Sequence, residues 1–205
     1  MSKLDYKKYE NNILERVGDK RYKHMLRVAQ SAKMLAQIHK ADVEKAELAG
    51  YLHDCGKLKN KEDYPRLCQE FGLSLSQDMK KAPAIIHGFL GAKLAEKLYE
   101  IKDRDILNAI SYHTTGRENM STLEKIIFLA DYIEPKRDFP QAKQAREIAK
   151  VNLDKAMFYV LDENIKNLIE LKNYIALDTI KARNYYLEKN EWKVFLKLSL
   201  LLFLL

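Results

Sequence analysis

Hydrophobic residues recur every three or four positions along most of the chain, and polar residues fill the positions between them. This period is typical of amphipathic α-helices, and no convincing two-residue alternation marks a strand. The pattern therefore predicts an all-α fold. The expected helices cover about residues 4–17, 19–39, 43–55, 84–100 and 103–113, followed by one that opens at 121, a long one that includes 156–169 and a last one from 178.

Capping residues stand before several of these segments. Ser121-Thr122-Leu123-Glu124 has the form of a capping box, and Pro135 can end the helix that it opens. An aspartate before a periodic stretch can accept hydrogen bonds from the free amides of the first helical turn. Four aspartates are expected to cap helices in this way: Asp19, Asp42, Asp103 and Asp178.

No linker divides the chain, which has 205 residues, only four prolines and seven glycines. We therefore expect one domain over residues 1–190. The stretch 60–83 predicts a short helix and a loop of the kind that often covers a site. The tail 191–205 is apolar over about a dozen residues, whereas a transmembrane helix needs about 20. We expect this tail to pack on the domain or in a homodimer contact, with a peripheral membrane anchor as the alternative.

Charge and cysteine content narrow the class of partner and the compartment. The chain has 36 basic and 29 acidic residues, a net charge of +7, which favours an anionic partner without specifying which one. The lysines are spread without runs, so no nucleic-acid partner is expected. Cys55 and Cys68 form no CxxC motif and no signal peptide is found, which predicts a cytoplasmic protein.

The candidate chemistry lies in histidines at the ends or edges of apolar helix faces. One such histidine is more often a core residue than a ligand, and His39, with no acid matched to it, is expected to be a plain surface or core residue. A buried carboxylate, however, needs a cation, and Asp131 stands within the apolar run 126–133. The remaining set follows an order in which each member lies about one helix and one connection from the next: His24, His53-Asp54, His87, His113 and Asp131.

This order resembles the HD superfamily of metal-dependent phosphohydrolases, whose H…HD…D pattern is similar to His24, His53-Asp54 and Asp131. His87 and His113 resemble the additional histidines of the subset that holds two metals. The likeness is closer to the YqeK-type symmetrical diadenosine tetraphosphate hydrolases, and the tail does not share it. The motifs that carry it are Arg21-x-x-His24, His53-Asp-Cys-Gly-Lys57, His113-Thr-Thr-Gly-Arg117, the stretch 130–140 and the stretch 179–184.

The resemblance implies an HD-domain helical bundle with a metal centre of two ions between the core helices. We expect His24, His53 and Asp131 to hold one ion, and His87 and His113 to hold the other. Asp54 would bridge them. Imidazole and carboxylate ligands without a thiolate suit iron or manganese better than a closed zinc site. Iron is the first choice because the resemblance implies it, and manganese or another transition metal is the alternative.

Phosphate binding requires cations besides the metals. Lys57, close after Asp54, is expected to contact a bridging or leaving oxygen and to act in catalysis with Asp54; the alternative is an exposed lysine. Arg137 suits bidentate phosphate contact, although a salt bridge at the helix end explains it equally well. Arg21 lies one helical turn before His24. The resemblance adds further substrate contacts at His24, Thr114, Arg117, Thr179, Arg183 and Asn184.

The expected function is hydrolysis of diadenosine tetraphosphate into two molecules of ADP. Another nucleotide phosphohydrolase of the HD type, such as a 5′-nucleotidase or a cyclic dinucleotide phosphodiesterase, is the alternative among enzymes. A regulatory domain that binds a nucleotide without cleaving it is the alternative of a different class. The complete set of six metal-binding groups argues against the regulatory domain.

Overall fold

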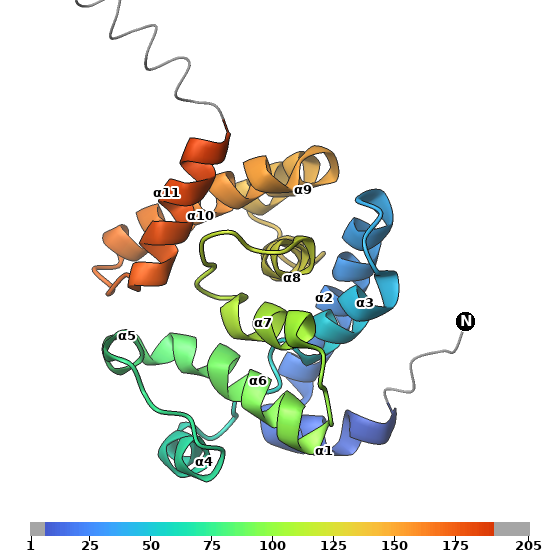
Figure 1. The fold of residues 1–205 in the computed structure, drawn as a ribbon, viewed down its shortest axis with the longest axis vertical. Coiled ribbons are helices and arrows are strands. Elements are labelled where there is room, and N and C mark those ends of the chain that lie inside the picture. The colour runs from blue at the N-terminus through green and yellow to red at the C-terminus, as the bar shows by residue number, and fades with distance from the viewer. Residues whose placement is uncertain (1–6, 191–205) are drawn as a thin grey trace, which may run out of the picture.

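The computed structural model describes residues 7–190, and every regular element in this range is a helix (Figure 1). The all-α prediction is confirmed. The predictions made for the tail 191–205 lie outside the described residues. In chain order the helices are α1 (Lys7–Val17), α2 (Asp19–Ile38), α3 (Val43–Leu52), the 3₁₀ turn η1 (Lys61–Asp63), α4 (Tyr64–Glu70), α5 (Gln77–Lys81), the 3₁₀ turn η2 (Pro83–Ile85), α6 (Ile86–Leu98), α7 (Arg104–Tyr112), α8 (Thr122–Ile133), α9 (Pro140–Val151), α10 (Leu153–Glu170) and α11 (Leu177–Lys189).

Helix α8 is the centre of the core. It packs against α2, α3, α7, α9 and α10, and Figure 1 shows it nearly end-on between α7 and α10. A helix that is apolar on all sides is buried on all sides. Asp131 lies in the last turn of this helix, so its position is fixed by the most enclosed element of the fold. The buried apolar residues of α8 are Leu123, Ile126, Ile127, Phe128, Leu129, Ala130 and Ile133.

Three of the predicted caps are confirmed. Asp42 accepts a hydrogen bond from the Lys45 amide, Asp103 accepts one from the Asp105 amide, and Ser121 and Glu124 form the predicted capping box.

The caps predicted at Asp19 and Asp178 are wrong, since the N-cap residues are Gly18 and Ala176 and the two aspartates lie in the first turn. The helix dipole stabilises an acid in the first turn, so aspartate is favoured there nearly as much as at the N-cap position. The long helix predicted to include 156–169 is confirmed as α10, whereas the separate helix α9 before it was not predicted. Asn152 separates α9 from α10 and caps α10 by accepting from the Lys155 amide.

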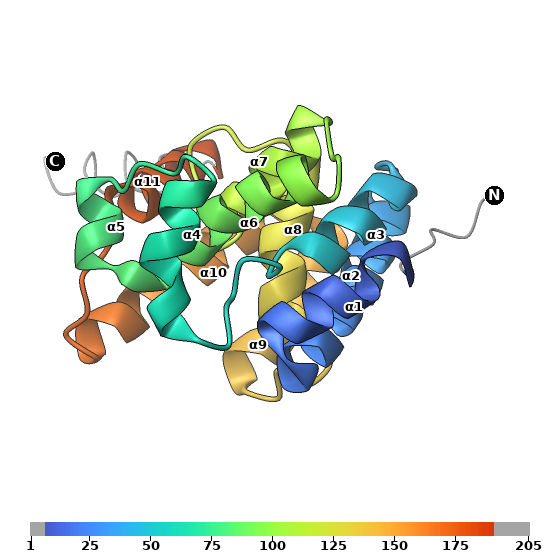
Figure 2. The ribbon, with the colours of Figure 1, turned by 90° about the horizontal axis from the view of Figure 1, so that it is seen from below.

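The segment between α3 and α6 confirms the short helix and loop predicted for 60–83, with α5 as a second short helix. Figure 2 shows α4 and α5 at the same end of the molecule as α10 and α11. Asp78 of α5 accepts hydrogen bonds from the Tyr174 hydroxyl at 2.7 Å and the Leu177 amide at 2.6 Å. The segment is therefore tied to the loop that joins α10 to α11. No helix between residues 7 and 190 combines the length and hydropathy needed to cross a bilayer.

Close helix contacts occur at glycines beside the predicted ligands. A Cβ atom on Gly50 would lie 2.9 Å from Ala29 Cα of α2, and one on Gly88 would lie 2.6 Å from Ser111 O of α7. A Cβ atom on Gly56 would collide with the His87 carbonyl oxygen and lie 2.5 Å from the Gly91 amide nitrogen. Any larger residue would therefore push apart the segments that carry the histidines.

We expect Gly56→Ala to lower the free energy of unfolding by at least about 3 kcal/mol, because the atoms it meets are backbone atoms that cannot turn aside. Gly72→Ala is the control. Gly72 has a φ of +65° but open space around its Cβ position, so this change should cost only about 1 kcal/mol. Urea unfolding of both variants measures the difference, and equal losses would show that the contact at Gly56 is not tight.

Candidate metal centre

Four histidines present their Nε2 atoms to one buried space. Their Nδ1 atoms each lie near an acceptor in the protein, which places the proton on Nδ1 and leaves the Nε2 lone pair for a cation. In three cases the acceptor is the backbone carbonyl three residues earlier. The pairs are His53 with Gly50 O at 2.7 Å, His87 with Ala84 O at 2.6 Å and His113 with Ile110 O at 2.7 Å.

The fourth histidine, His24, is oriented by Glu134. The His24 Nδ1 atom lies 3.3 Å from Glu134 Oε1, and Arg27 Nε donates to Glu134 Oε2 at 2.6 Å. Glu134 is buried and also accepts from the Lys136 amide. Glu134 was not predicted from the sequence. Its place directly before Pro135, inside a stretch that carries the resemblance, is the signal that could have identified it.

The carboxylate of Asp54 lies between two histidine pairs. Its Oδ2 atom is 3.3 Å from His53 Nε2 and 3.7 Å from His24 Nε2. Its Oδ1 atom is 3.2 Å from His87 Nε2 and 3.6 Å from His113 Nε2. Each oxygen therefore faces a different pair, which is the arrangement a bridging carboxylate needs.

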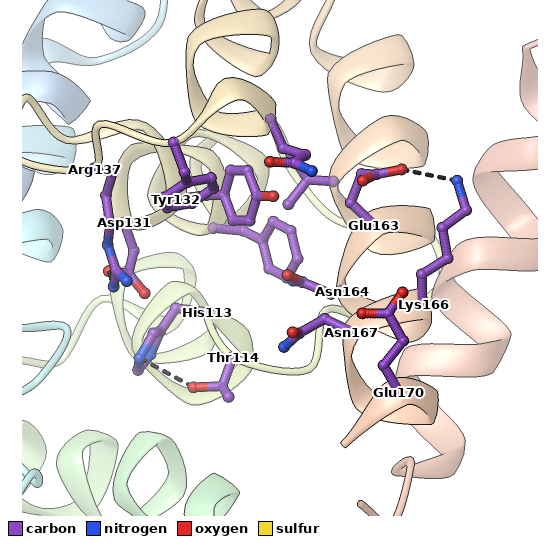
Figure 3. A pocket seen from close by; sticks show the side chains of 14 residues that line it. His113, Thr114, Asp131, Tyr132, Arg137, Glu163, Asn164, Lys166, Asn167 and Glu170 are labelled. Atoms are coloured by element: carbon purple, nitrogen blue, oxygen red, sulfur yellow. Dashed lines mark hydrogen bonds and ion pairs between the residues drawn. The ribbon is translucent and has the colours of Figure 1, made fainter. Parts of the chain in front are cut away.

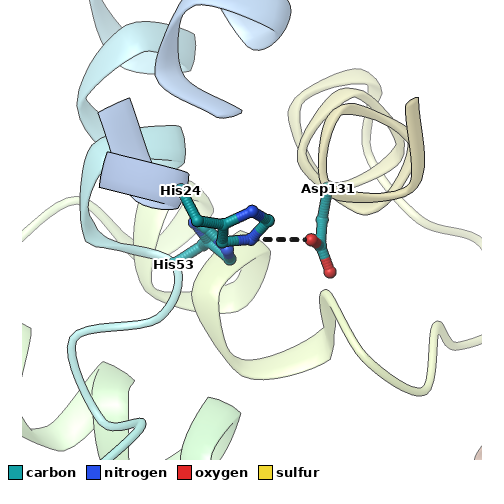
Figure 4. A group of neighbouring side chains, drawn as sticks. All are labelled: His24, His53 and Asp131. Atoms are coloured by element: carbon teal, nitrogen blue, oxygen red, sulfur yellow. Dashed lines mark ion pairs between the residues drawn. The ribbon is translucent and has the colours of Figure 1, made fainter. Parts of the chain in front are cut away.

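Asp131 completes the group from α8. Its Oδ1 atom lies 3.0 Å from His24 Nε2, and its side chain is 25% exposed. Figure 4 shows His24 and His53 on one side and Asp131 facing them from the other. His24, His53 and Asp131 offer ligand atoms within 4.8 Å of one another, as do His53, Asp54 and His113. The structure thus brings all six predicted ligands together.

The buried atoms of this cluster fit a metal ion better than they fit one another. His24 Nε2, His53 Nε2 and Asp54 Oδ1 are buried and make no hydrogen bond of acceptable geometry. Leaving a buried polar atom unmatched costs about 1–3 kcal/mol. Cations bound between them would satisfy all three atoms. The residues present are therefore able to hold metal ions.

The protonation states of His87 and Asp54 also favour cation binding. Burial lowers the pKa of His87 to about 4, which leaves a neutral imidazole near pH 7. Burial acts to raise the pKa of Asp54, but the charge of His53 and the close ring nitrogens of His113, His53 and His87 outweigh it and hold the pKa well below its usual range. Asp54 therefore remains a carboxylate. For His53, burial lowers the pKa, but the neighbouring Asp54 raises it by a larger amount, so the net shift is upward.

Two neighbours of Asp54 in the sequence differ in role. Cys55 donates its thiol to the Gly91 carbonyl at 3.3 Å, and burial raises its pKa to about 12. The prediction of a plain buried thiol is confirmed. Lys57 is half-buried, and burial lowers the pKa of its ammonium group. Arg21, from α2, donates to Asp54 Oδ2 at 2.8 Å and so supplies the positive charge closest to this carboxylate.

A cavity of about 550 Å³ opens beside the cluster (Figure 3). Asp131, Arg137, His113 and Thr114 lie at one end, and polar residues of α10 lie at the other. The Thr114 hydroxyl is 3.1 Å from His113 Nε2, and Arg137 Nη2 is 3.3 Å from Asp131 Oδ1. The sequence predicted α10 only as an amphipathic helix, and its role as a cavity wall was missed. The polar residues of α10 that form this wall recur at helical spacing: Glu163, Asn164, Lys166, Asn167 and Glu170.

The other predicted substrate contacts do not line this cavity within the described part of the chain. Arg117 donates to buried Glu124 at 2.6 Å, and Arg183 donates to Asp162 at 3.0 Å. Asn184 accepts a hydrogen bond from Arg183, and Thr179 is buried in α11. Their assignment came from resemblance alone and stays a prediction.

A profile described as the HD domain matches residues 21–136, the stretch that contains all six clustered residues. The chain belongs to the HD domain family.

Related HD-domain proteins match nearly the whole chain. The "Bis(5'-nucleosyl)-tetraphosphatase, symmetrical" of Halalkalibacterium halodurans is 41% identical over 82% of this chain and 89% of its own length. The protein of the same name from Staphylococcus aureus is 36% identical over 89% of this chain and 95% of its own. A crystal structure described as a "predicted HD superfamily hydrolase involved in NAD metabolism", from Clostridium acetobutylicum, is 41% identical, with a TM-score of 0.85 over 92% of this chain and 100% of its own.

Glu134→Gln should weaken metal binding about 10- to 100-fold, because the carboxylate that orients His24 loses its charge. Glu124→Gln is a matched control, since Glu124 is also a buried glutamate held by an arginine, but it lies at the other end of α8 and outside the cluster. Metal titration followed by calorimetry compares the two. If both variants bind metal as the wild type does, Glu134 has no positioning role.

Proposed function

We propose that this HD-domain protein hydrolyses diadenosine tetraphosphate symmetrically, giving two molecules of ADP at a centre of two metal ions. The observation that carries the proposal is the position of the Asp54 carboxylate. Each of its two oxygens faces a different histidine pair, and a cavity of nucleotide size lies beside the cluster. The relatives named symmetrical bis(5'-nucleosyl)-tetraphosphatase support this substrate.

One ion would be held by His24, His53 and Asp131, and the other by His87 and His113. Asp54 would be a ligand of both ions. When bound, two ions supply a water of lowered pKa and positive charge for the phosphate oxygens. The neutral imidazole of His87 and the ionised carboxylate of Asp54 suit divalent iron, with manganese as the alternative. Cys55, next to Asp54 in the sequence, offers no thiolate ligand, because its raised pKa keeps the thiol protonated.

Side chains around the cluster can position the substrate. Arg137 is 40% exposed at the cavity edge and can donate two parallel hydrogen bonds to a phosphate. Lys57, beside His87 and outside this cavity, is placed to neutralise the oxygen of the departing ADP. The ring of Tyr132 and the amides of Asn164 and Asn167 also line the cavity, where they can offer stacking and hydrogen bonds to a nucleoside.

We further propose a cytoplasmic location, which the unpaired, buried thiols of Cys55 and Cys68 support. The homodimer expected from the apolar tail stays a prediction, because residues 191–205 lie outside the described range.

Asp54→Asn should remove bound metal and lower kcat for diadenosine tetraphosphate at least about 1,000-fold, because the shared carboxylate is lost. Asp138→Asn, at an aspartate that is 79% exposed, should change neither. Elemental analysis and chromatography of the products make the measurement. ADP as the sole wild-type product supports the proposal. ATP with AMP, adenosine released from AMP, or tight binding without turnover would each contradict it.

Arg137→Ala should raise the KM for diadenosine tetraphosphate about 10- to 100-fold, the effect of losing a charge-assisted phosphate contact. Arg183→Ala is the matched comparison. Because Arg183 lies outside the cavity lining and is paired with Asp162, its loss should change KM less than about twofold and act mainly on stability. Equal effects of the two substitutions would support the contact that the resemblance implied for Arg183 and contradict the structural argument.

A further inference from the structure

A second cavity borders the same cluster from the side of α4 and α6. It has a volume of about 470 Å³ and reaches the cluster through His87, whereas the first cavity reaches it through His113 and Asp131. The two cavities share no lining residue. His87 Nε2 and His113 Nε2 are 3.0 Å apart, so the two cavities border neighbouring residues of one centre.

The helices that frame these cavities lie on different sides of α7. In Figure 1, α4, which lines the second cavity, lies below α7, whereas α8 and α10, which line the first cavity, lie above it. A linear ligand that passed over the histidines could therefore place one end in each cavity. Both volumes fall in the range of about 300–1,000 Å³ that small-molecule sites occupy.

The lining of the second cavity suits a base and an anionic chain. Lys57 and Lys61 are its two cations, and the Tyr64 ring is part of its wall. The Tyr64 hydroxyl donates to the Gly56 carbonyl at 3.0 Å and accepts from the Leu58 amide at 3.2 Å. The ring is thus fixed to the backbone that follows His53 and Asp54. The other wall residues are apolar in the main: Leu58, Pro65, Cys68, Leu75, Pro83, Ala84 and Ile86.

We propose that this second cavity binds the other nucleoside of the dinucleotide, so that the phosphate chain crosses the centre between two nucleoside sites. The inference rests on the proposed function and extends it to substrate specificity. With a nucleoside held on each side, the middle of the chain lies over the cluster. Water then adds across the central P–O–P bond, and each half leaves as ADP. One nucleoside site alone would place no restraint on the far half.

The test uses two ligands that cannot be hydrolysed at the centre, each with a methylene group in place of the central bridging oxygen. One is the diadenosine tetraphosphate analogue and the other is the adenosine tetraphosphate analogue, which has a single nucleoside. Calorimetry on the metal-loaded wild-type protein should show at least about tenfold tighter binding of the dinucleoside ligand, the effect of burying a second nucleoside.

Leu75→Trp fills the second cavity from a half-buried loop position. This substitution should reduce the difference in affinity between the two ligands to within about twofold. The single-nucleoside ligand should keep its affinity, which shows that the variant is folded. Pro65→Trp, at an exposed wall residue on α4, should do the same. Gln69→Trp, exposed on α4 but outside the cavity lining, is the control and should preserve the difference.

Equal affinity of the wild-type protein for the two ligands would overturn the second site. An equal loss of affinity for both ligands in Leu75→Trp and Pro65→Trp would also overturn it. Turnover of unmodified diadenosine tetraphosphate is measured in parallel. A wild-type protein that distinguishes the two analogues but forms no ADP would contradict the proposed hydrolase and still support two nucleoside sites.

Discussion

The Asp54 carboxylate is the group on which the centre of this fold depends. Its side chain is 3% exposed, and burying an isolated charge costs several kcal/mol. The protein meets this cost with Arg21 at 2.8 Å and with imidazoles that α2, α3, α6 and α7 bring to the two oxygens. Four helices thus converge on one carboxylate, and the tight crossings at Gly50, Gly56 and Gly88 allow them to come so close.

Much of this could be predicted from the sequence because the signals were local. Helical periodicity identified most helices, and an acid such as Asp131 among apolar neighbours has few explanations other than a site. The misplaced caps at Asp19 and Asp178 show the limit of local signals, because the helix dipole and the cap favour the same residue at adjacent positions. Helix α9 was not predicted, because its buried face consists of the alanines Ala142, Ala145 and Ala149, which give only a weak apolar signal.

What the sequence could not predict depends on tertiary contacts. Asn164 and Asn167 occupy the polar face of α10, and periodicity does not distinguish a polar face that meets water from one that lines a cavity. The partners of Arg117 and Arg183 are likewise set by which carboxylate lies nearest in the fold, Glu124 and Asp162. A motif can thus place a residue near a site without giving its side chain a free charge to offer there.

The unmatched atoms of the cluster link stability to ligand binding. Each of His24 Nε2, His53 Nε2 and Asp54 Oδ1 destabilises the metal-free fold, and a cation bound only to the folded state recovers that free energy. Apolar side chains of similar size could make the metal-free protein more stable, as happens when buried ionic groups are replaced in other folds. The cluster is therefore better explained by what it binds than by the stability it gives to the chain.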